Sequence, residues 1–318
     1  MSRLARALIA LELFCAGGLA AASDARALGS APTWTQMRLA IRAAHLGEGT
    51  LPALFFRPQE SGGEASVRRH PAAIVLHGCG GLGREGQLST RHAMWRDLLL
   101  EQGFAVVFPL SFPPRGFTEV CTIPSGERSV SALDRVADVL AAAEALRARP
   151  DIDPDRLVLI GFSHGGSTVL ATLTREPRAL GLFRRAIAFY PGCRAYAQAA
   201  ERGQRLKLAS PLTILIGTAD DWTPAEPCER WVEALKSEGQ PVEIVLYPGA
   251  YHGFDQPTGP LRVRRDVPGG VNPGRGVTVG PDPAAREDAK AQVRARLAPL
   301  AQAAPSAVWP RPAASAPR

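Results

Sequence analysis

The chain has 318 residues, 46% hydrophobic and 21% charged, a composition that excludes a disulfide-stapled miniprotein or a disordered chain. Outside a short N-terminal stretch, no uncharged apolar run reaches the roughly 18 residues needed to cross a bilayer, which excludes an integral membrane protein. The net charge of +7 comes mostly from residues 261–318, which hold ten Lys or Arg and four Asp or Glu. We therefore expect a solvated basic tail and no nucleic-acid partner, with tail binding to an anionic surface as the alternative.

The N-terminal residues 1–27 have the pattern of an export signal. Arg3 and Arg6 precede an Ala-rich apolar stretch that ends in the small-residue cleavage pattern Ala25-Arg26-Ala27. Removal of this segment leaves four of the five cysteines, and an even number fits an oxidising compartment. We expect a periplasmic or secreted protein that no longer contacts a membrane, with a cytoplasmic protein that keeps an N-terminal helix as the alternative.

Residues 28–303 are expected to form one domain, because apolar runs alternate with helical patterns and no linker interrupts them. Strands are predicted at residues 37–43, 51–57, 72–76, 105–109, 157–161, 186–190, 212–217 and 242–247. Helices are predicted at residues 89–102, 129–147, 164–174, 225–237 and 284–300. This alternation predicts an α/β fold with a mostly parallel sheet, helices on both faces and an antiparallel edge at the first two strands. A long loop is expected at residues 257–283 and a disordered Pro/Ala-rich tail at residues 304–318.

A Gly-x-Ser-x-Gly sequence at residues 161–165 lies between a buried strand and a helical pattern. A tight strand-to-helix turn holds its central residue in a strained conformation, which would project the Ser163 hydroxyl above the sheet as a nucleophile. The flanking glycines are needed because a β-carbon at Gly161 or Gly165 would collide across the turn. The alternative is a Gly-rich turn in which Ser163 only caps the helix.

A serine nucleophile needs a base that is oriented by a carboxylate. Apart from His164, His252 is the only histidine that follows Ser163, and it comes just after the last predicted strand. Asp220 and Asp221 follow the strand before it. Because the carboxyl ends of parallel strands meet at one edge of a sheet, we expect His252 and one of these acids near Ser163. A loop histidine that caps backbone groups is the alternative for His252.

Two backbone N–H groups are needed to stabilise the oxyanion of a tetrahedral intermediate. One is expected from His164, directly after the nucleophile and at the positive end of its helix. The other is expected from the sequence His-Gly-Cys-Gly-Gly at residues 77–81, which follows a buried strand. A plain Gly-rich turn is the alternative, and His77 is expected to be structural.

Together these motifs resemble the dienelactone hydrolase family of α/β-hydrolases, over roughly residues 51–257 and the final helix. The most specific parts are Gly-x-x-Asp-x-x-x-Pro at residues 217–224 and Tyr-Pro-Gly-Ala-x-His-Gly-Phe at residues 247–254. The resemblance implies that Asp220 is the triad acid and that Cys79 gives the second oxyanion N–H. It also implies hydrolysis of an ester, a lactone or a similar acyl bond, without cofactor or metal.

The sequence departs from the family pattern at two positions. The type enzymes have a Cys nucleophile where this chain has Ser163, and a Glu in the oxyanion loop where it has Gly78. The two changes agree with each other, because a Ser–His–Asp enzyme has no thiolate for the Glu to contact. They argue against dienelactone itself as the substrate.

The sequence therefore predicts a serine hydrolase of a small ester or lactone that works through an acyl-enzyme. Acyl transfer or peptide cleavage by the same triad, and a secreted non-catalytic binding protein, are the alternatives. Arg115 is a weaker candidate for binding a substrate carboxylate, with a surface Arg as the alternative. Tyr190 and Trp222 are candidates for the pocket wall, with a place in the core as the alternative.

The four remaining cysteines are expected at the carboxyl edge of the sheet, in two neighbouring pairs. Cys79 and Cys121 lie in loops after adjacent strands, and Cys193 and Cys228 lie after another adjacent pair. We predict Cys79–Cys121 and Cys193–Cys228 disulfides from this placement. Buried free thiols in a cytoplasmic enzyme are the alternative.

Overall fold

The computed structural model describes residues 34–46, 49–59, 69–84 and 87–302. The expected export signal at residues 1–27 and the expected tail at residues 304–318 lie outside the described residues. The strands are β1 (Trp34–Arg42), β2 (Thr50–Pro58), β3 (His70–Leu76), β4 (Ala105–Pro109), β5 (Ile152–Phe162), β6 (Arg185–Phe189), β7 (Leu212–Gly217), β8 (Val242–Tyr247), β9 (Arg262–Arg264) and β10 (Val277–Val279). The α-helices are α1 (Thr90–Glu101), α2 (Val136–Arg147), α3 (His164–Arg175), α4 (Arg194–Glu201), α5 (Ala225–Ser237) and α6 (Pro283–Gln302). Short 3₁₀ turns are found at Ala44–Leu46, Pro113–Arg115 and Pro177–Ala179.

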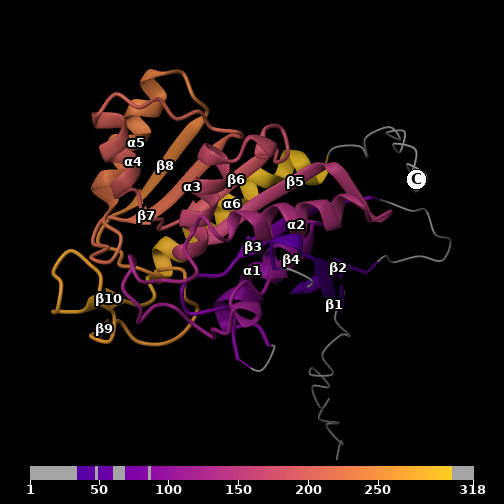
Figure 1. The fold of residues 1–318 in the computed structure, drawn as a ribbon, viewed down its shortest axis with the longest axis horizontal. Coiled ribbons are helices and arrows are strands. Elements are labelled where there is room, and N and C mark those ends of the chain that lie inside the picture. The colour runs from indigo at the N-terminus through magenta and orange to yellow at the C-terminus, as the bar shows by residue number, and fades with distance from the viewer. Residues whose placement is uncertain (1–33, 47–48, 60–68, 85–86, 303–318) are drawn as a thin grey trace, which may run out of the picture. The chain divides into compact units, whose positions relative to one another are not determined.

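Eight strands form the central sheet, in the order β1-β2-β4-β3-β5-β6-β7-β8 (Figure 1). β1 pairs antiparallel with β2, and β2 pairs antiparallel with β4. From β4 to β8 every pairing is parallel. The prediction of a mostly parallel sheet with an antiparallel edge is therefore confirmed. Every residue of β3, β4 and β7 is buried, as expected for strands with helices on both faces.

Helices cover both faces of this sheet. In Figure 1, α2 and α3 lie in front of the strands and α6 passes behind them. α1 lies next to α6, because the Gln102 side chain at the end of α1 donates to the Arg294 carbonyl in α6 at 2.9 Å. Within the described residues, no helix is both long enough and apolar enough to cross a membrane. Nor does any group of three or more His, Cys, Asp or Glu side chains in this part of the chain form a candidate metal site.

The structure differs from the prediction in three segments. Helix α2 starts at Val136 instead of residue 129, because the Asp134 carboxylate accepts from the Ser131 N–H at 2.7 Å and closes a turn before it. The predicted loop at residues 257–283 contains the antiparallel β9–β10 pair. Helix α4 was not predicted, because its eight residues make only about two turns, which is shorter than the window over which a helical period is recognised.

Candidate active site

Ser163 lies in the turn between β5 and α3, in a strained backbone conformation. Its φ is +53°, and Tyr190 is the other non-glycine residue with positive φ in the described part of the chain. A Cβ at Gly161 would lie 2.2 Å from the Gly165 carbonyl oxygen, and a Cβ at Gly165 would lie 2.4 Å from the Leu76 oxygen. The turn therefore requires glycine at both positions. The Ser163 side chain makes no capping hydrogen bond to α3, which argues against the alternative role as a helix cap.

The Ser163 hydroxyl is the first member of a chain of two hydrogen bonds. Its Oγ lies 2.9 Å from Nε2 of His252, and Nδ1 of His252 lies 2.8 Å from Oδ2 of Asp220. His252 is 4% exposed and Asp220 is 3% exposed, so both are largely shielded from water. Because the Asp220 carboxylate accepts from Nδ1–H, Nε2 is left to accept the Ser163 proton. This arrangement can deprotonate the serine as it attacks a substrate.

Asp220 is fixed by the residues that follow it. Its Oδ1 accepts from the backbone N–H groups of Trp222 at 2.9 Å and Thr223 at 2.8 Å. The Thr223 hydroxyl lies 3.1 Å from Oδ2 of Asp220 and 3.0 Å from the Tyr190 carbonyl. The sequence analysis did not identify Thr223, and the only signal for it was its place three residues after the acid.

The neighbouring acid, Asp221, points elsewhere. Its carboxylate accepts from the Thr278 N–H at 2.7 Å and from the Thr278 hydroxyl at 2.9 Å. Its carbonyl oxygen accepts from the Val271 N–H at 2.8 Å. Asp221 therefore anchors the β9–β10 segment, and Asp220 is the acid that contacts His252.

The Gly-rich loop after β3 packs directly against the Ser163 turn. A Cβ at Gly78 would lie 3.4 Å from the Ser163 Cβ, so the two segments are in van der Waals contact. Neither the Cys79 N–H nor the His164 N–H donates a hydrogen bond within the described residues, which leaves both available to an oxyanion. Cys79 is held by a disulfide to Cys121, with the Cα atoms 4.9 Å apart, and its carbonyl accepts from the Val120 N–H.

His77 has a structural role, as expected. Its Nδ1 lies 2.9 Å from the Gly78 carbonyl, and its Nε2 accepts from the Ser111 N–H at 3.4 Å. Burial, followed by the charge of Arg135, lowers the pKa of His77 well below the usual value. The imidazole is therefore neutral and braces the loop.

Two of the three weaker candidates do not face an open pocket. Arg115 binds both carboxylate oxygens of Asp138, at 2.9 and 3.0 Å, and the Ser111 carbonyl, which replaces the expected contact with a substrate carboxylate. Tyr190 has no exposed surface, so it supports the site from the core instead of forming a pocket wall. Its ring centroid lies 4.6 Å from that of His252.

Trp222 is the weaker candidate that retains a place beside the catalytic groups. The centroid of the Trp222 ring lies 4.7 Å from that of His252. The guanidinium of Arg264 lies 5.6 Å from the same Trp222 centroid. The ring is only partly buried. Trp222 can therefore contact a substrate bound at Ser163.

A second hydrophobic cluster lies beside this site, separate from the main core. Its partly buried members are Phe117, Ile123 and Trp222. Its buried members are Cys79, Phe112, Val120, Cys121, Val130, Val267, Val277 and Val279. Since it includes both the oxyanion loop and the tryptophan beside His252, the cluster gives the site an apolar surround.

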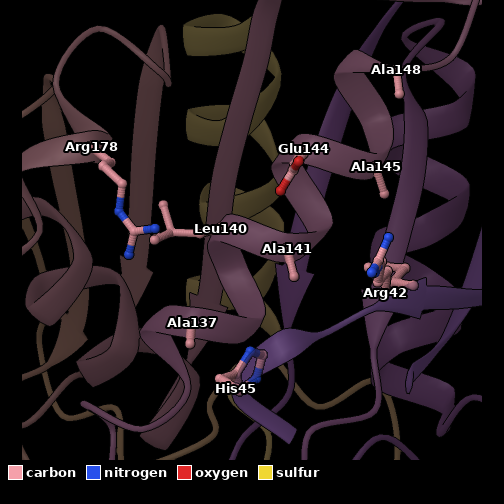
Figure 2. Close-up of a pocket in the computed structure, with 10 residues that line it drawn as sticks. Arg42, His45, Ala137, Leu140, Ala141, Glu144, Ala145, Ala148 and Arg178 are labelled. Carbon is pink, nitrogen blue, oxygen red and sulfur yellow. The ribbon is translucent and has the colours of Figure 1, made fainter. Parts of the chain in front are cut away.

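Two pockets differ in their relation to these residues. A pocket of about 160 Å³ is lined by His77, Gly81 and Phe112, next to the oxyanion loop. A pocket of about 570 Å³ lies between α2 and the end of β1, where Figure 2 shows Arg42, His45 and Leu140. None of the candidate catalytic residues lines the second pocket.

The structure also contains both predicted disulfides. Cys193 and Cys228 form the second bridge, again with Cα atoms 4.9 Å apart. It joins the loop after β6 to helix α5, and it lies at the same edge of the sheet as the Cys79–Cys121 bridge.

Comparison with known proteins gives one family. The profile of the dienelactone hydrolase family matches residues 53–298. An Escherichia coli K12 protein named "Putative carboxymethylenebutenolidase" is 25% identical over 216 residues, which are 64% of this chain and 73% of that protein. Among solved structures, the dienelactone hydrolase-like promiscuous phosphotriesterase P91, from metagenomic libraries, has a TM-score of 0.57 at 17% identity, covering 84% and 99% of the two chains.

Esterase 2 of Thermogutta terrifontis, solved after phosphorylation by paraoxon, has a TM-score of 0.54 at 18% identity, covering 82% of this chain and 92% of its own. The TM-scores of these two structures show a shared fold. The match to the family profile shows that the chain is a member of the family. The chain belongs to the dienelactone hydrolase family and is a serine-type hydrolase of the α/β class.

Proposed function

We propose that this protein hydrolyses a small carboxylic ester or lactone through a Ser163–His252–Asp220 triad. The observation that carries the proposal is the pair of hydrogen bonds at 2.9 and 2.8 Å that joins these side chains. Ser163 Oγ attacks the carbonyl carbon while its proton moves to Nε2 of His252. The oxyanion that forms accepts from the N–H groups of Cys79 and His164.

The acyl-enzyme forms and breaks down by the same proton path. Collapse of the first intermediate breaks the bond to the leaving oxygen, which takes the proton from His252. A water then gives a proton to Nε2 of His252 and attacks the acyl carbon. The second collapse returns the proton to Ser163 Oγ and releases the carboxylic acid.

A small, largely apolar acyl group fits the surroundings of the serine. The hydrophobic cluster that contains Cys79 and Trp222 reaches from the oxyanion loop to the ring beside His252. Arg115 was the candidate for binding a substrate carboxylate. Because its guanidinium binds Asp138, we propose a substrate without a carboxylate. An esterase and a phosphotriesterase are among the proteins with a similar fold, which agrees with an ester substrate.

Hydrolysis of p-nitrophenyl acetate and butyrate by the purified full chain tests the proposal. Ser163→Ala is expected to lose about 10⁴-fold or more in kcat. Ser237→Ala, at the exposed end of α5, is the matched control and should keep wild-type activity. A Ser163→Ala variant that keeps more than about a tenth of kcat would overturn the assignment of Ser163 as the nucleophile.

Peptide cleavage is the competing activity. A puromycin-hydrolysing peptidase of Mycobacterium tuberculosis has a TM-score of 0.52 at 21% identity, with 69% of this chain and 36% of that one covered. Aminoacyl p-nitroanilides assayed beside the esters separate the two. Faster turnover of the anilides would show that the protein is a peptidase that uses the same triad, and not an esterase.

We also propose that the protein works outside the cytoplasm, after removal of residues 1–27. The two disulfides and the Arg-led apolar N-terminal sequence support this location. Mass spectrometry of the protein recovered from its native host decides the matter. A chain that begins near residue 28 with no free thiol agrees with the proposal, whereas a chain that starts at Met1 and has all five cysteines as free thiols contradicts it.

A further inference from the structure

Arg135 is a fully buried arginine that contacts both segments of the candidate oxyanion hole. It directly precedes α2 and has no exposed surface. Its Nη1 donates to the His77 carbonyl at 2.9 Å and lies 3.0 Å from Nδ1 of His164. His77 belongs to the Gly-rich loop two residues before Cys79, and His164 is the residue after Ser163. One guanidinium nitrogen thus joins the two segments that provide the oxyanion donors.

This guanidinium lacks the carboxylate that usually accompanies a buried arginine. Within the described residues, no carboxylate lies within ion-pair distance of Arg135, and its Nε and Nη2 have no hydrogen-bond partner. Asp138, one turn further along α2, binds Arg115 on one side and His45 at 2.7 Å on the other. His45 lies at the pocket shown in Figure 2. The Asp138 carboxylate is therefore already engaged by Arg115 and His45.

A buried charge without a partner is costly to the folded state. Burial lowers the pKa of Arg135 to about 9, even though the charge of Asp138 acts in the opposite direction. At neutral pH the guanidinium is therefore still protonated. The guanidinium carbon of Arg135 lies 5.3 Å from the centroid of the Phe112 ring. A negative oxygen that forms nearby would provide the missing charge partner.

Arg135 also fixes the state of His164. Because a guanidinium N–H can only donate, Nδ1 of His164 must be the accepting nitrogen of a neutral ring. Burial and then the charge of Arg135 lower the pKa of His164 well below its usual value, which agrees with a neutral ring. The contact with Arg135 holds the ring at the start of α3, in the residue whose N–H is the proposed oxyanion donor.

The His77 carbonyl is held from two sides. Arg135 donates to it, and a Cβ at Gly165 would lie 2.7 Å from it, so α3 packs directly against this oxygen. The carbonyl can then neither rotate nor move away without breaking one of these contacts. As a result, the Gly-rich loop keeps a fixed distance from the start of α3.

We propose that Arg135 is a positioning residue for ester hydrolysis: it sets the separation of the Cys79 and His164 N–H donors and places a positive charge on the oxyanion side of Ser163. The inference rests on the proposed function. Removal of a direct oxyanion donor lowers kcat by roughly 10²–10³-fold, and a residue that acts through two donors should have a smaller effect, about 10–100-fold. The effect should fall on kcat, because the donors act mainly in the transition state.

The test uses Arg135→Met, which removes the charge and the donors but keeps a long side chain. Arg115→Met is the matched control, because Arg115 is a partly buried arginine of the same region whose hydrogen bonds go to Asp138 and Ser111 and not to the oxyanion segments. With p-nitrophenyl butyrate, Arg135→Met should lose about 10–100-fold in kcat with KM changed by less than about threefold. Inhibition by butylboronic acid, which forms a tetrahedral anionic adduct on serine, should weaken by a factor similar to the loss in kcat. Arg115→Met should keep kcat within about threefold.

A second variant covers the case in which Arg135→Met does not fold. His164→Ala removes the same contact from the other end and leaves the backbone N–H in place. It should lose about tenfold in kcat at unchanged KM, and in a folded double variant the two losses should not multiply. Near-wild-type kcat in either folded variant, or an equal loss in Arg115→Met, would overturn the role of Arg135.

Wild type and Ser163→Ala are assayed in the same experiment. If wild type does not hydrolyse the ester, or if Ser163→Ala remains active, the proposed function fails. If both behave as proposed while Arg135→Met keeps kcat and boronate affinity, only the inference about Arg135 fails.

Discussion

The hydroxyl of Tyr190 donates a 2.6 Å hydrogen bond to Asp255, which follows His252 by three residues. Asp255 is fully buried and also accepts from the Trp95 indole at 2.8 Å, with the Arg91 Nε at 3.4 Å. Burial, together with the charge of Asp255, raises the pKa of Tyr190 well above its usual value, so the phenol remains a donor. Asp255 therefore anchors the loop that carries His252 to the core through Tyr190 and Trp95.

We predict that Tyr190→Phe lowers the free energy of unfolding by about 1–3 kcal/mol, because it leaves a buried acceptor short of one donor. The ring beside His252 is retained, so kcat should fall by less than about tenfold. Urea unfolding and ester kinetics on the same preparation measure the two effects. A loss of kcat without any loss of stability would show that the hydroxyl acts in the reaction and not in anchoring.

Asp220→Asn should be far more damaging than Asp221→Asn. Asn cannot stabilise the imidazolium and favours the wrong tautomer of His252, at a cost of about 10⁴-fold in kcat. Asp221 binds Thr278, so its variant should loosen the β9–β10 segment and keep most of kcat. Steady-state kinetics of the two variants decide between the acids, and an inactive Asp221→Asn beside an active Asp220→Asn would reverse the assignment.

The two disulfides should differ in their effect on activity. They close loops of 42 and 35 residues, so by chain entropy each contributes up to about 4 kcal/mol of stability. A Cys79→Ser/Cys121→Ser double variant should also lose kcat, because the bridge holds the loop whose Cys79 N–H is the proposed oxyanion donor. The Cys193→Ser/Cys228→Ser variant is the control and should lose stability alone. Equal kcat in the two variants would show that the first bridge does not support the oxyanion loop.

Buried neutral histidines should make the fold sensitive to acid. The pKa values of His77 and His164 lie well below the usual 6.5, and burial lowers that of His92 to about 3. Below pH 6.5 the unfolded chain takes up protons that the folded chain does not, so stability is lost as the pH falls. Each such histidine costs up to about 1.4 kcal/mol per pH unit in that range.

Urea titrations between pH 7 and pH 4 measure this slope. His92→Gln should reduce the steepness, since one of the buried imidazoles is then absent. An unchanged slope in a folded His92→Gln variant would contradict the assignment of a depressed pKa to that ring.

The sequence predicted the elements whose pattern is local. The bounds of β7, β8 and α5 agree residue for residue with the expected ranges, because each is a continuous apolar or amphipathic run between turn signals. The Ser163 and His252 candidates also followed from local motifs at strand ends, and the choice of Asp220 over Asp221 followed from the family resemblance. The structure brings all three residues together.

The remaining features depend on contacts between distant residues. The β9–β10 segment is held by Asp221 across 57 positions, and Arg115 is bound by Asp138 across 23. Arg135 reaches His77 across 58 positions, and no motif marks it. Such long-range pairs leave no periodic or spacing signal in a single sequence, which is why the Arg115–Asp138 pair was not predicted and Arg135 was not identified.

Intact-mass and peptide-mapping analysis of an acid-quenched reaction with p-nitrophenyl butyrate tests the central claim most directly, because an acyl-enzyme on Ser163 is a covalent species. The account predicts one butyryl group per chain, located on the peptide that contains Ser163 and absent from the Ser163→Ala variant. An adduct on another residue, or an adduct that persists in Ser163→Ala, would contradict it.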